Sequence, residues 1–447
     1  MSTATAGTPR PQSLSLSLAR TIAWPRVTTT IAVTSAAGLS LAPSLLPRSA
    51  VTQAVFTALS VLCALTLLAA SRALRGKLGR TPRTVSAGAR QGVLVVSIAG
   101  CGAAVLAADH WQNGLRAAMG VDPVGAGHWT TVAIVSGLVV AGTRGLAIGV
   151  RRIGPVRTVA AGAVLAVAGY AASLGVVPTA GTSALSASLA AGVSGSSESL
   201  VSWETLGEQG RRFVTLASDH SPIRTYVGAE SAPDAQARAV LAVRELDRAG
   251  GFDRGHVVVA VPTGSGWVDA NAVAGFEAVY GDDLALVATQ YSSAPSWVTF
   301  VFDRDAATEA ATALVDTVRA HLATLAPAHR PQLHVYGQSL GAVGAGAAFD
   351  GFRAPGPCEA LWAGPPAGSV RADGGTVLAN SSDPVIRWQP SLLWSPPDLS
   401  RARVDAPMPT WLPIVGFLQT TVDLLFALDA TPGHGHRYGP DQARCAS

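Results

Sequence analysis

One serine lies in the setting that a nucleophilic serine requires. Residues 337–341 read Gly-Gln-Ser-Leu-Gly, which is the pattern G-x-S-x-G. An apolar run, Gln332 to Tyr336, precedes the pattern and small residues follow it, so we expect a strand, a sharp turn and a helix. Such a turn exposes the hydroxyl, and the flanking glycines let strand and helix pack closely. We therefore predict Ser339 as the nucleophile of an acyl-transfer reaction.

Acyl transfer also needs hydrogen-bond donors for the oxyanion of the tetrahedral intermediate. The backbone N–H of Leu340 stands at the start of the expected helix and is one candidate. The second comes from the glycine-rich segment after an apolar run, where we predict Thr263 or Gly264 as the donor. An ordinary glycine turn is the alternative for that segment.

The acid and the base should follow the serine along the chain, the acid first. Asp383 lies on the loop that follows the apolar run Gly375 to Asn380, so we predict it as the acid. The alternative is that Asp383, which precedes Pro384, only shapes a turn. Three other aspartates have no strand directly before them: Asp373, Asp398 and Asp405.

Two histidines compete for the role of the base. His434 and His436 share a glycine-flanked loop near the C-terminus. We favour His436 and keep His434 as the runner-up; the other ring would bond locally or face solvent. Upstream, Tyr291, Ser292 and Trp297 follow an apolar run and are predicted to line the substrate pocket, although core packing explains Trp297 equally well.

The elements that must position these residues alternate between strands and helices. Such alternation predicts a mainly parallel sheet flanked by helices over residues 211–447, and the G-x-S-x-G turn after one of its strands indicates the α/β-hydrolase fold. The expected strands are His256 to Val261, Leu284 to Gln290, Gln332 to Tyr336, Glu359 to Ala363 and Gly375 to Asn380, and the expected helices are Val268 to Tyr280, Ala306 to Leu325 and Ala342 to Phe349.

The N-terminal half has a different composition. Residues 1–198 carry 15 Lys and Arg against 3 Asp and Glu, whereas residues 199–447 carry 17 against 25. A bilayer core of about 30 Å needs about 20 apolar helical residues. An α-helical membrane domain of about five spans is therefore predicted over residues 27–177, at Val27 to Leu46, Ala50 to Ala70, Gln91 to Ala108, Trp129 to Val150 and Thr158 to Val177.

The basic residues also predict an orientation. They gather before the first span, between the second and third, and between the fourth and fifth, and such residues favour the cytoplasmic side. This pattern predicts a cytoplasmic tail over residues 1–26, a multi-pass protein of the cytoplasmic membrane with its N-terminus inside, and a catalytic domain outside. Residues 178–210 are rich in Gly, Ala and Ser and are expected to form a linker.

Composition excludes several classes of function. The basic excess sits between apolar runs and the aqueous half is acidic, which argues against nucleic-acid binding. No Cys/His spacing resembles a zinc site, so neither a metal nor a cofactor is predicted. Cys358 and Cys445 would both lie outside the membrane, where a disulfide and two unpaired thiols remain equally open. The oligomeric state is not determined by the sequence.

The chain resembles a known family, the actinobacterial membrane-anchored proteins of the α/β-hydrolase family with a separate N-terminal membrane domain. In the catalytic half the resemblance rests on seven ordered blocks: PTGSGWVD (262–269), QYSSAPSW (290–297), YGQSLG (336–341), LWAGPP (361–366), SDPVIRW (382–388), WLPIVGFLQ (411–419) and GHGHRY (433–438). It implies a Ser-Asp-His hydrolase and carries these roles onto Ser339, Asp383 and His436. Where the family has glutamate before the nucleophile, this chain has Gln338.

The expected function is that of a membrane-anchored serine hydrolase that cleaves an ester through an acyl-enzyme. Its expected partners are the lipid bilayer and an ester or lipid-like substrate, for which a lipid or cell-envelope acyl group is favoured by location alone. An acyltransferase would use the same residues, and a non-catalytic membrane assembly or transport protein could retain the fold. The apolar stretch Trp411 to Leu428 is expected to form a cap or an interfacial helix rather than a sixth span, because it contains Pro413 and Asp423.

Overall fold

The computed structural model of the chain describes residues 25–79, 85–153, 192–294, 299, 303–349, 359–371 and 375–443. Two compact units divide the chain. The first contains Met1–Leu41, Ala50–Ala108 and His128–Gly145, and the second contains Ala42–Ser49, Asp109–Gly127 and Leu146–Ser447. The α/β unit therefore includes two short segments from the N-terminal half of the sequence.

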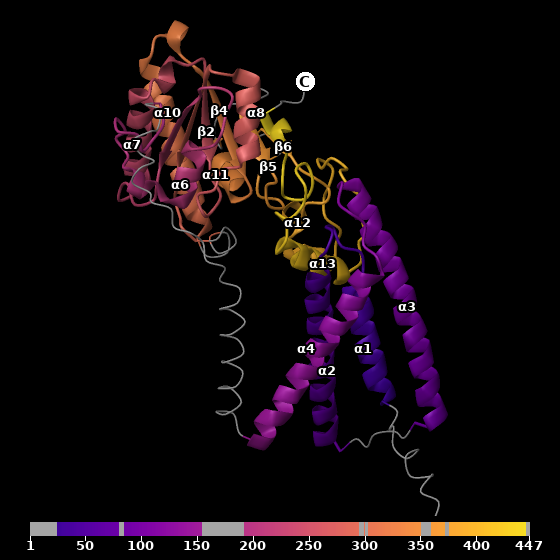
Figure 1. Cartoon of the computed structure of the whole chain (residues 1–447). Coiled ribbons are helices and arrows are strands. Elements are labelled where there is room, and N and C mark those ends of the chain that lie inside the picture. Colours follow the sequence, from indigo (N-terminus) through magenta and orange to yellow (C-terminus); the bar gives the residue numbers. More distant parts are fainter. Residues whose placement is uncertain are drawn as a thin grey trace, which may run out of the picture. The chain divides into compact units, whose positions relative to one another are not determined.

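Long apolar helices form the first unit (Figure 1). The helices of the N-terminal half are α1 (Val27–Ser40), α2 (Ala50–Lys77), α3 (Ala87–Ala118) and α4 (Ala126–Ile153). Of the helices that the structure describes, three are long and apolar enough to cross a membrane, namely α2, α3 and the Ala126–Ala147 part of α4. Between 6% and 22% of their most apolar windows is buried, so most of these apolar side chains face outward.

The expected count of about five spans is not confirmed. A span was expected over Val27 to Leu46, but α1 ends at Ser40 after 14 residues, or about 21 Å of helix. Pro43 follows closely and cannot donate to a helical hydrogen bond. Leu45 and Leu46 are instead buried in a small cluster of the second unit. The expected fifth span, Thr158 to Val177, lies outside the described residues.

A six-stranded sheet forms the centre of the second unit. Its order is β1-β3-β2-β4-β5-β6, and every neighbouring pair is parallel. The strands are β1 (Ile223–Val227), β2 (His256–Val261), β3 (Leu284–Thr289), β4 (Gln332–Gln338), β5 (Ala360–Ala363) and β6 (Thr376–Leu378). The chain passes from β2 to one neighbour, β3, and then crosses to the other, β4. The sheet thus has a topological switch point between β2 and β4, where ligands of open α/β sheets bind.

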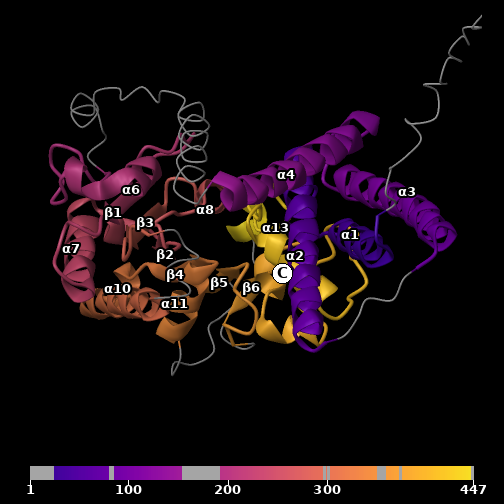
Figure 2. The ribbon, with the colours of Figure 1, turned by 90° about the horizontal axis from the view of Figure 1, so that it is seen from below.

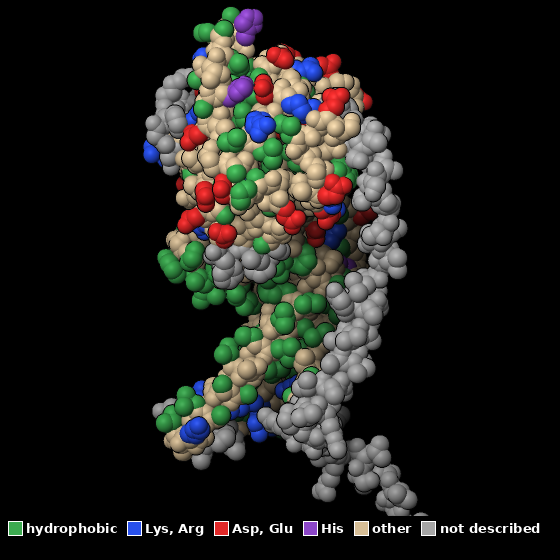
Figure 3. All heavy atoms as spheres, turned by 90° about the vertical axis from the view of Figure 1, so that its left-hand side faces the viewer, with side chains coloured by type: hydrophobic (Ala, Val, Ile, Leu, Met, Phe, Trp, Pro, Cys, Tyr) green, Lys and Arg blue, Asp and Glu red, His purple; other side chains and the backbone are tan. Residues whose placement is uncertain are grey.

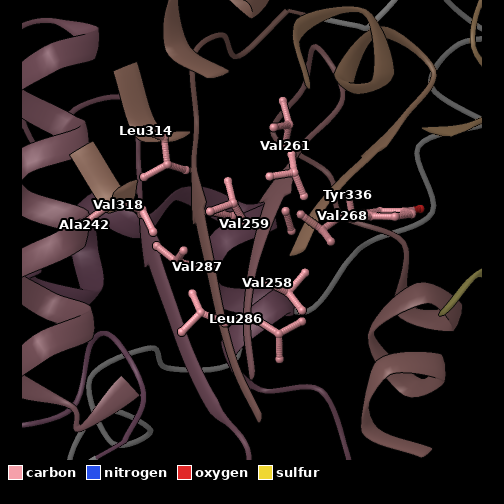
Figure 4. Packing of buried hydrophobic residues seen from close by; sticks show 14 of the residues in the cluster. Ala242, Val258, Val259, Val261, Val268, Leu286, Val287, Leu314, Val318 and Tyr336 are labelled. Carbon is pink, nitrogen blue, oxygen red and sulfur yellow. The ribbon is translucent and has the colours of Figure 1, made fainter. Parts of the chain in front are cut away.

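Helices cover both faces of the sheet (Figure 2). On one face α7 (Ala235–Arg248) and α11 (Leu340–Phe349) both pack against α10 (Arg304–Thr324), and on the other lie α6 (Gly207–Val214) and α8 (Ala270–Tyr280). The core between these layers is built from strand valines and leucines such as Val258, Val259 and Leu286, which meet Leu314 and Val318 of α10 or the opposite layer (Figure 4). The predicted fold class is therefore confirmed.

All five expected strands are present, but the sequence analysis missed β1. Its sequence, Ile-Arg-Thr-Tyr-Val, reads as partly polar, yet all five residues are buried. Arg224 can be buried because it forms an ion pair with Glu277 of α8. Residues 192–210, expected as linker, also contribute to this unit: Val201, Trp203 and Leu206 are buried in its core. Three scattered apolar residues in a Gly- and Ser-rich background give no periodic pattern that would have revealed this.

A largely irregular region lies between Asp383 and the histidine loop. It contains α12 (Pro384–Arg387), a 3-10 turn η5 (Pro390–Leu393) and α13 (Val415–Leu424), and the 3-10 turn η6 (Pro440–Ala443) follows the loop. We call residues 384–430 the cap. The expectation of a helix in Trp411 to Leu428 is met by α13, which is much shorter than a membrane span.

The cap is fastened to the segment Ala42–Ser49 by a buried ion pair. Arg48 NH2 lies 2.7 Å from Asp423 Oδ1 of α13, and both side chains are at most 2% exposed. Asp423 Oδ2 also accepts a hydrogen bond from the Leu45 backbone N–H at 2.7 Å. The second segment, Asp109–Gly127, is also bonded to this unit, since Thr431 Oγ1 donates to the Met119 carbonyl oxygen at 2.8 Å. The two N-terminal segments are therefore structural parts of the α/β unit.

The Asp423→Ala variant should be strongly destabilised, because it leaves the Arg48 guanidinium buried without its carboxylate. We expect a loss of about 3–5 kcal/mol in the free energy of unfolding. The control is Asp441→Ala, which removes the exposed pair between Arg403 and Asp441 and should cost less than about 1 kcal/mol. Denaturation of both detergent-solubilised variants measures the difference, and equal losses would contradict the structural role of the buried pair.

Candidate active site

Ser339 occupies a strained turn between strand and helix. β4 ends at Gln338 and α11 begins at Leu340, so a single residue makes the turn. Ser339 has φ +54°, one of two positive values among the described non-glycine residues. Its backbone N–H donates to the Ala363 carbonyl oxygen at 2.9 Å, and the side chain is only partly buried. The strand-turn-helix arrangement expected from the sequence is therefore present, with the hydroxyl accessible.

The flanking glycine at position 341 is required by close packing. A Cβ atom there would overlap the carbonyl oxygen of Val261, the last residue of β2, and lie 2.8 Å from the Pro262 carbonyl oxygen. The turn at Ser339 thus lies directly against the segment that follows β2. This is the switch point of the sheet, so the nucleophile candidate and the expected oxyanion loop are neighbours.

The two candidates for the second oxyanion donor differ in availability. The Thr263 N–H already donates to the Trp267 carbonyl oxygen at 2.9 Å, which closes the turn of this loop. Gly264 is the next residue, is buried, and carries no side chain that would block an approaching oxygen. Leu340 is the first residue of α11, so its N–H is one of those a helix leaves unpaired. The geometry therefore favours Leu340 and Gly264 over Thr263.

Asp383 and His436 form a buried hydrogen-bonded pair. His436 Nδ1 lies 2.7 Å from Asp383 Oδ2, and their side chains are 7% and 0% exposed. Asp383 also caps α12, since its Oδ1 accepts the Val385 N–H at 2.7 Å. The carboxylate is thereby held still, and its bond to Nδ1 leaves Nε2 as the nitrogen that can accept a proton.

Two contacts bring His436 next to the Ser339 turn. Gln338 Nε2 donates to the His436 carbonyl oxygen at 3.0 Å. Gly364, the residue after Ala363, has φ +54°, and a Cβ atom there would lie 2.7 Å from His436 Cε1 and 2.8 Å from Asp383 Oδ2. The His436 imidazole therefore lies close to Gly364, and the Ser339 backbone is bonded to the adjacent residue, Ala363. A glutamate in place of Gln338 could not donate to that carbonyl oxygen.

His434 belongs to a different pair. Its Nδ1 lies 3.1 Å from Asp405 Oδ2, and the same carboxylate accepts hydrogen bonds from the Ser382 N–H and hydroxyl. The Ser382 hydroxyl oxygen in turn accepts the Gly435 N–H at 2.8 Å. This second pair joins the loop that carries Asp383 to the loop that carries His436. His434 therefore contacts Asp405, whereas the loop of His436 contacts Gln338, the residue before Ser339.

Tyr438 is a functional candidate that the sequence analysis missed. Its hydroxyl donates to Asp383 Oδ2 at 2.7 Å, the same oxygen that His436 contacts. Burial, together with the Asp383 carboxylate, raises the pKa of Tyr438 well above its usual value, so the phenol remains a donor at neutral pH. The only sequence signal was its position two residues after His436.

A buried cation balances the carboxylates around the site. The Arg387 side chain donates from Nε to the Ser381 carbonyl oxygen at 2.8 Å. Burial lowers the pKa of Arg387 to about 10, opposed by the charges of Asp405, Asp383 and Asp423. The group therefore stays charged at neutral pH.

The expected pocket residues are only partly accounted for. The Tyr291 hydroxyl donates to the Pro262 carbonyl oxygen at 3.0 Å, so it steadies the expected oxyanion loop. Ser292 accepts a hydrogen bond at its carbonyl oxygen from Gln290 Nε2. Trp297 lies outside the described residues, as do Cys358 and Cys445.

A cavity of about 390 Å³ opens beside this loop, with polar walls that include Ser265, Gln290 and Ser293. Three acidic residues, Glu204, Glu208 and Glu230, and Arg211 complete its charged lining. None of these residues belongs to the loops of Ser339, Asp383 or His436. Within the described ranges, no group of three or more His, Cys, Asp or Glu side chains could hold a metal ion.

Two family models match the chain. A model described as "Alpha/beta-hydrolase family" matches residues 223–374 and 375–446, which include Ser339, Asp383 and His436. A model described as "Alpha/beta-hydrolase family N-terminus" matches residues 41–192. No curated protein and no solved structure matches the chain.

Replacing each histidine of the loop by alanine should distinguish a catalytic base from a histidine that only holds the loop in place. His436→Ala should lower the turnover of an ester by about a thousandfold or more, as for members of a catalytic unit. His434→Ala removes only the contact with Asp405 and should lower turnover much less. Steady-state rates on an aryl ester measure both, and a larger loss for His434→Ala would transfer the role of base to His434.

Proposed function

This chain belongs to the alpha/beta-hydrolase family, and from that premise we propose that it is a membrane-anchored serine hydrolase that cleaves an ester through an acyl-enzyme. The proposal is supported by one observation: Ser339 makes a strained turn at the switch point of the sheet, and the preceding residue, Gln338, is hydrogen-bonded to the loop that carries the buried Asp383–His436 pair. Fold alone would not support catalysis, because non-catalytic proteins share it.

The proposed reaction assigns one task to each group. His436 Nε2 takes the proton of the Ser339 hydroxyl as the oxygen attacks the ester carbonyl carbon, and later returns it to the alcohol that leaves. Asp383 fixes the tautomer and stabilises the imidazolium, and Tyr438 holds the Asp383 oxygen in place. The N–H groups of Leu340 and Gly264 stabilise the oxyanion. Water then releases the acyl group from the serine.

Membrane anchoring rests on the three apolar helices and on charge. Hydrophobic side chains cover much of the helical part in Figure 3, whereas acidic and basic side chains are spread over the visible face of the α/β unit. Lys and Arg gather in the segment before α1, in the loop between α2 and α3 and after α4, and such basic segments are expected on the cytoplasmic side of the membrane. We propose a multi-pass protein of the cytoplasmic membrane.

The two segments that pack with the α/β unit support a catalytic domain outside the cytoplasm. Ala42–Ser49 precedes α2 and Asp109–Gly127 joins α3 to α4, so both lie on the same side if α2 and α3 each cross once. These segments are poor in Lys and Arg compared with the loop between α2 and α3, which favours the outer side. The α/β unit contains them and therefore shares that side. The fifth span expected from the sequence, Thr158 to Val177, would give the same side and lies outside the described residues.

Ser339→Ala should abolish turnover while leaving stability nearly unchanged, because one hydroxyl at a partly exposed turn makes no core contact. We expect a change below about 0.5 kcal/mol in the free energy of unfolding. Ser265→Ala, in the neighbouring loop, is the matched control and should retain turnover. Rates on a short-chain aryl ester and melting curves of the membrane-extracted proteins test this. Turnover that persists in Ser339→Ala and disappears in Ser265→Ala would refute the assignment.

A reporter that is active only outside the cytoplasm should be active when fused after Ser199, because the proposed topology places the α/β unit outside. A second fusion, after Lys77 at the end of α2, should be inactive and serves as the control. Activity measured in intact cells decides the orientation. An inactive Ser199 fusion beside an active Lys77 fusion would reverse it.

A further inference from the structure

Helix α13 buries polar side chains and leaves its apolar side chains only half-buried. Its polar residues Gln419, Thr420 and Asp423 are buried, with 3%, 4% and 1% of their surface exposed. Leu425, directly after the helix, is 77% exposed, and Ile414, directly before it, is 58% exposed. Surface helices of proteins in water carry the opposite pattern, with apolar residues facing the core. The outward side of α13 is therefore suited to an apolar medium.

The buried contacts of α13 fix this orientation. Asp423 is paired with Arg48, and Arg48 NH2 also donates to the Gln419 carbonyl oxygen at 3.3 Å. On the same helix, the Thr421 hydroxyl accepts a hydrogen bond from Trp388 Nε1 at 2.9 Å. Turning the helix to bury its half-buried leucines, Leu418 and Leu424, would break a buried ion pair, which is a costly change. The polar contacts of α13 therefore keep its apolar residues from full burial.

Other exposed apolar side chains extend this surface. The Ile414 N–H donates to the Leu393 carbonyl oxygen at 3.0 Å, which brings Trp394 and Leu412 close to the start of α13. Ile414 is held at φ +65°, a conformation that branched side chains rarely adopt. We define the outer apolar face of the cap as five exposed apolar residues that lie at or near the two ends of α13: Trp394, Leu412, Ile414, Leu425 and Leu428. Several exposed apolar side chains in one region of a surface are typical of an interaction site.

Chain connectivity identifies the partner. Only Ser49 separates Arg48, the residue bonded to α13, from Ala50, where the apolar helix α2 begins. Two peptide units span at most about 7–8 Å, so the chain itself holds the residue that is bonded to α13 close to the first residue of α2. A short helix at that depth, with an exposed apolar side, suits the boundary between headgroups and acyl chains. Tryptophan is favoured in the same zone.

We infer that the outer apolar face of the cap is a lipid-binding surface, seated in the outer boundary of the bilayer. The same surface is joined to the candidate site, since the Ala427 carbonyl oxygen accepts the His436 N–H at 3.0 Å. If the proposed hydrolase activity holds, the site would draw an amphipathic lipid ester directly from the bilayer. That last consequence rests on the proposed hydrolase activity, whereas the lipid contact rests only on the proposed membrane crossing of α2 and its orientation.

Site-directed spin labelling of the full-length chain tests the contact. Cys63, Cys101, Cys358 and Cys445 are replaced by alanine, and a nitroxide is attached at Leu425→Cys or Leu412→Cys in phosphatidylcholine/phosphatidylglycerol nanodiscs. Both labels should collide more with oxygen than with a water-soluble nickel chelate. Val240→Cys on α7 and Val279→Cys on α8, which are 43% and 47% exposed, are the controls and should show the opposite preference. Labels at 412 and 425 that behave like the controls, or that are shielded from both reagents by protein, would overturn the inference.

A second experiment separates lipid contact from catalysis. The double variant Leu412→Ser/Leu425→Ser should turn over a phospholipid ester in vesicles roughly tenfold more slowly, because buried leucine side chains supply transfer free energy to the contact. Its turnover of a short soluble aryl ester should be unchanged, whereas an equal loss on both substrates would overturn the role in substrate supply. Should the unmodified protein cleave neither ester, the proposed function would fail, and the spin-label result would still decide the lipid contact.

Discussion

The hydrogen bond between Asp383 and His436 is the interaction on which the candidate site depends. One carboxylate receives the Val385 N–H, the His436 imidazole and the Tyr438 hydroxyl, so it joins the loop after β6 to the last loop of the chain. Position 364 must be glycine because any side chain would enter this space. The turn at Ser339 is joined to the same region by the preceding residue, because Gln338 Nε2 donates a hydrogen bond to the His436 carbonyl oxygen. A buried, fully bonded carboxylate can orient an imidazole without being protonated itself.

The Arg48–Asp423 pair sets a second constraint, on where the site can be. A buried ion pair contributes little net stability but specifies one arrangement strongly, because each charge is costly without the other. Here it joins the segment before α2 to the cap, whose residue Ala427 holds the His436 backbone. The histidine loop is thereby tied to the segments that adjoin the apolar helices. The α/β unit accordingly includes two segments of the N-terminal half, Ala42–Ser49 and Asp109–Gly127.

Local patterns predicted much of this arrangement. The five expected strands and the turn at Ser339 were readable because each depends on neighbours in sequence. The roles of Ser339, Asp383 and His436 stay predictions. β1 was not, since its Arg224 is buried only by virtue of Glu277, 53 residues later. The pairing of His434 with Asp405 and the Tyr438 contact likewise depend on distant residues. The orientation of α13 could not be predicted, because polar residues such as Asp423 are normally expected to face water.

Trapping the acyl-enzyme tests the central claim most directly. The purified full-length protein is mixed with an aryl ester, quenched in acid within milliseconds, digested and mapped by mass spectrometry. The account predicts that the added acyl group resides on Ser339 and that its accumulation requires His436, with the His436→Ala protein showing little or none in the same time. An acyl group found on Ser265 or another residue, or hydrolysis without any covalent adduct at Ser339 under conditions where the acyl-enzyme should accumulate, would contradict it.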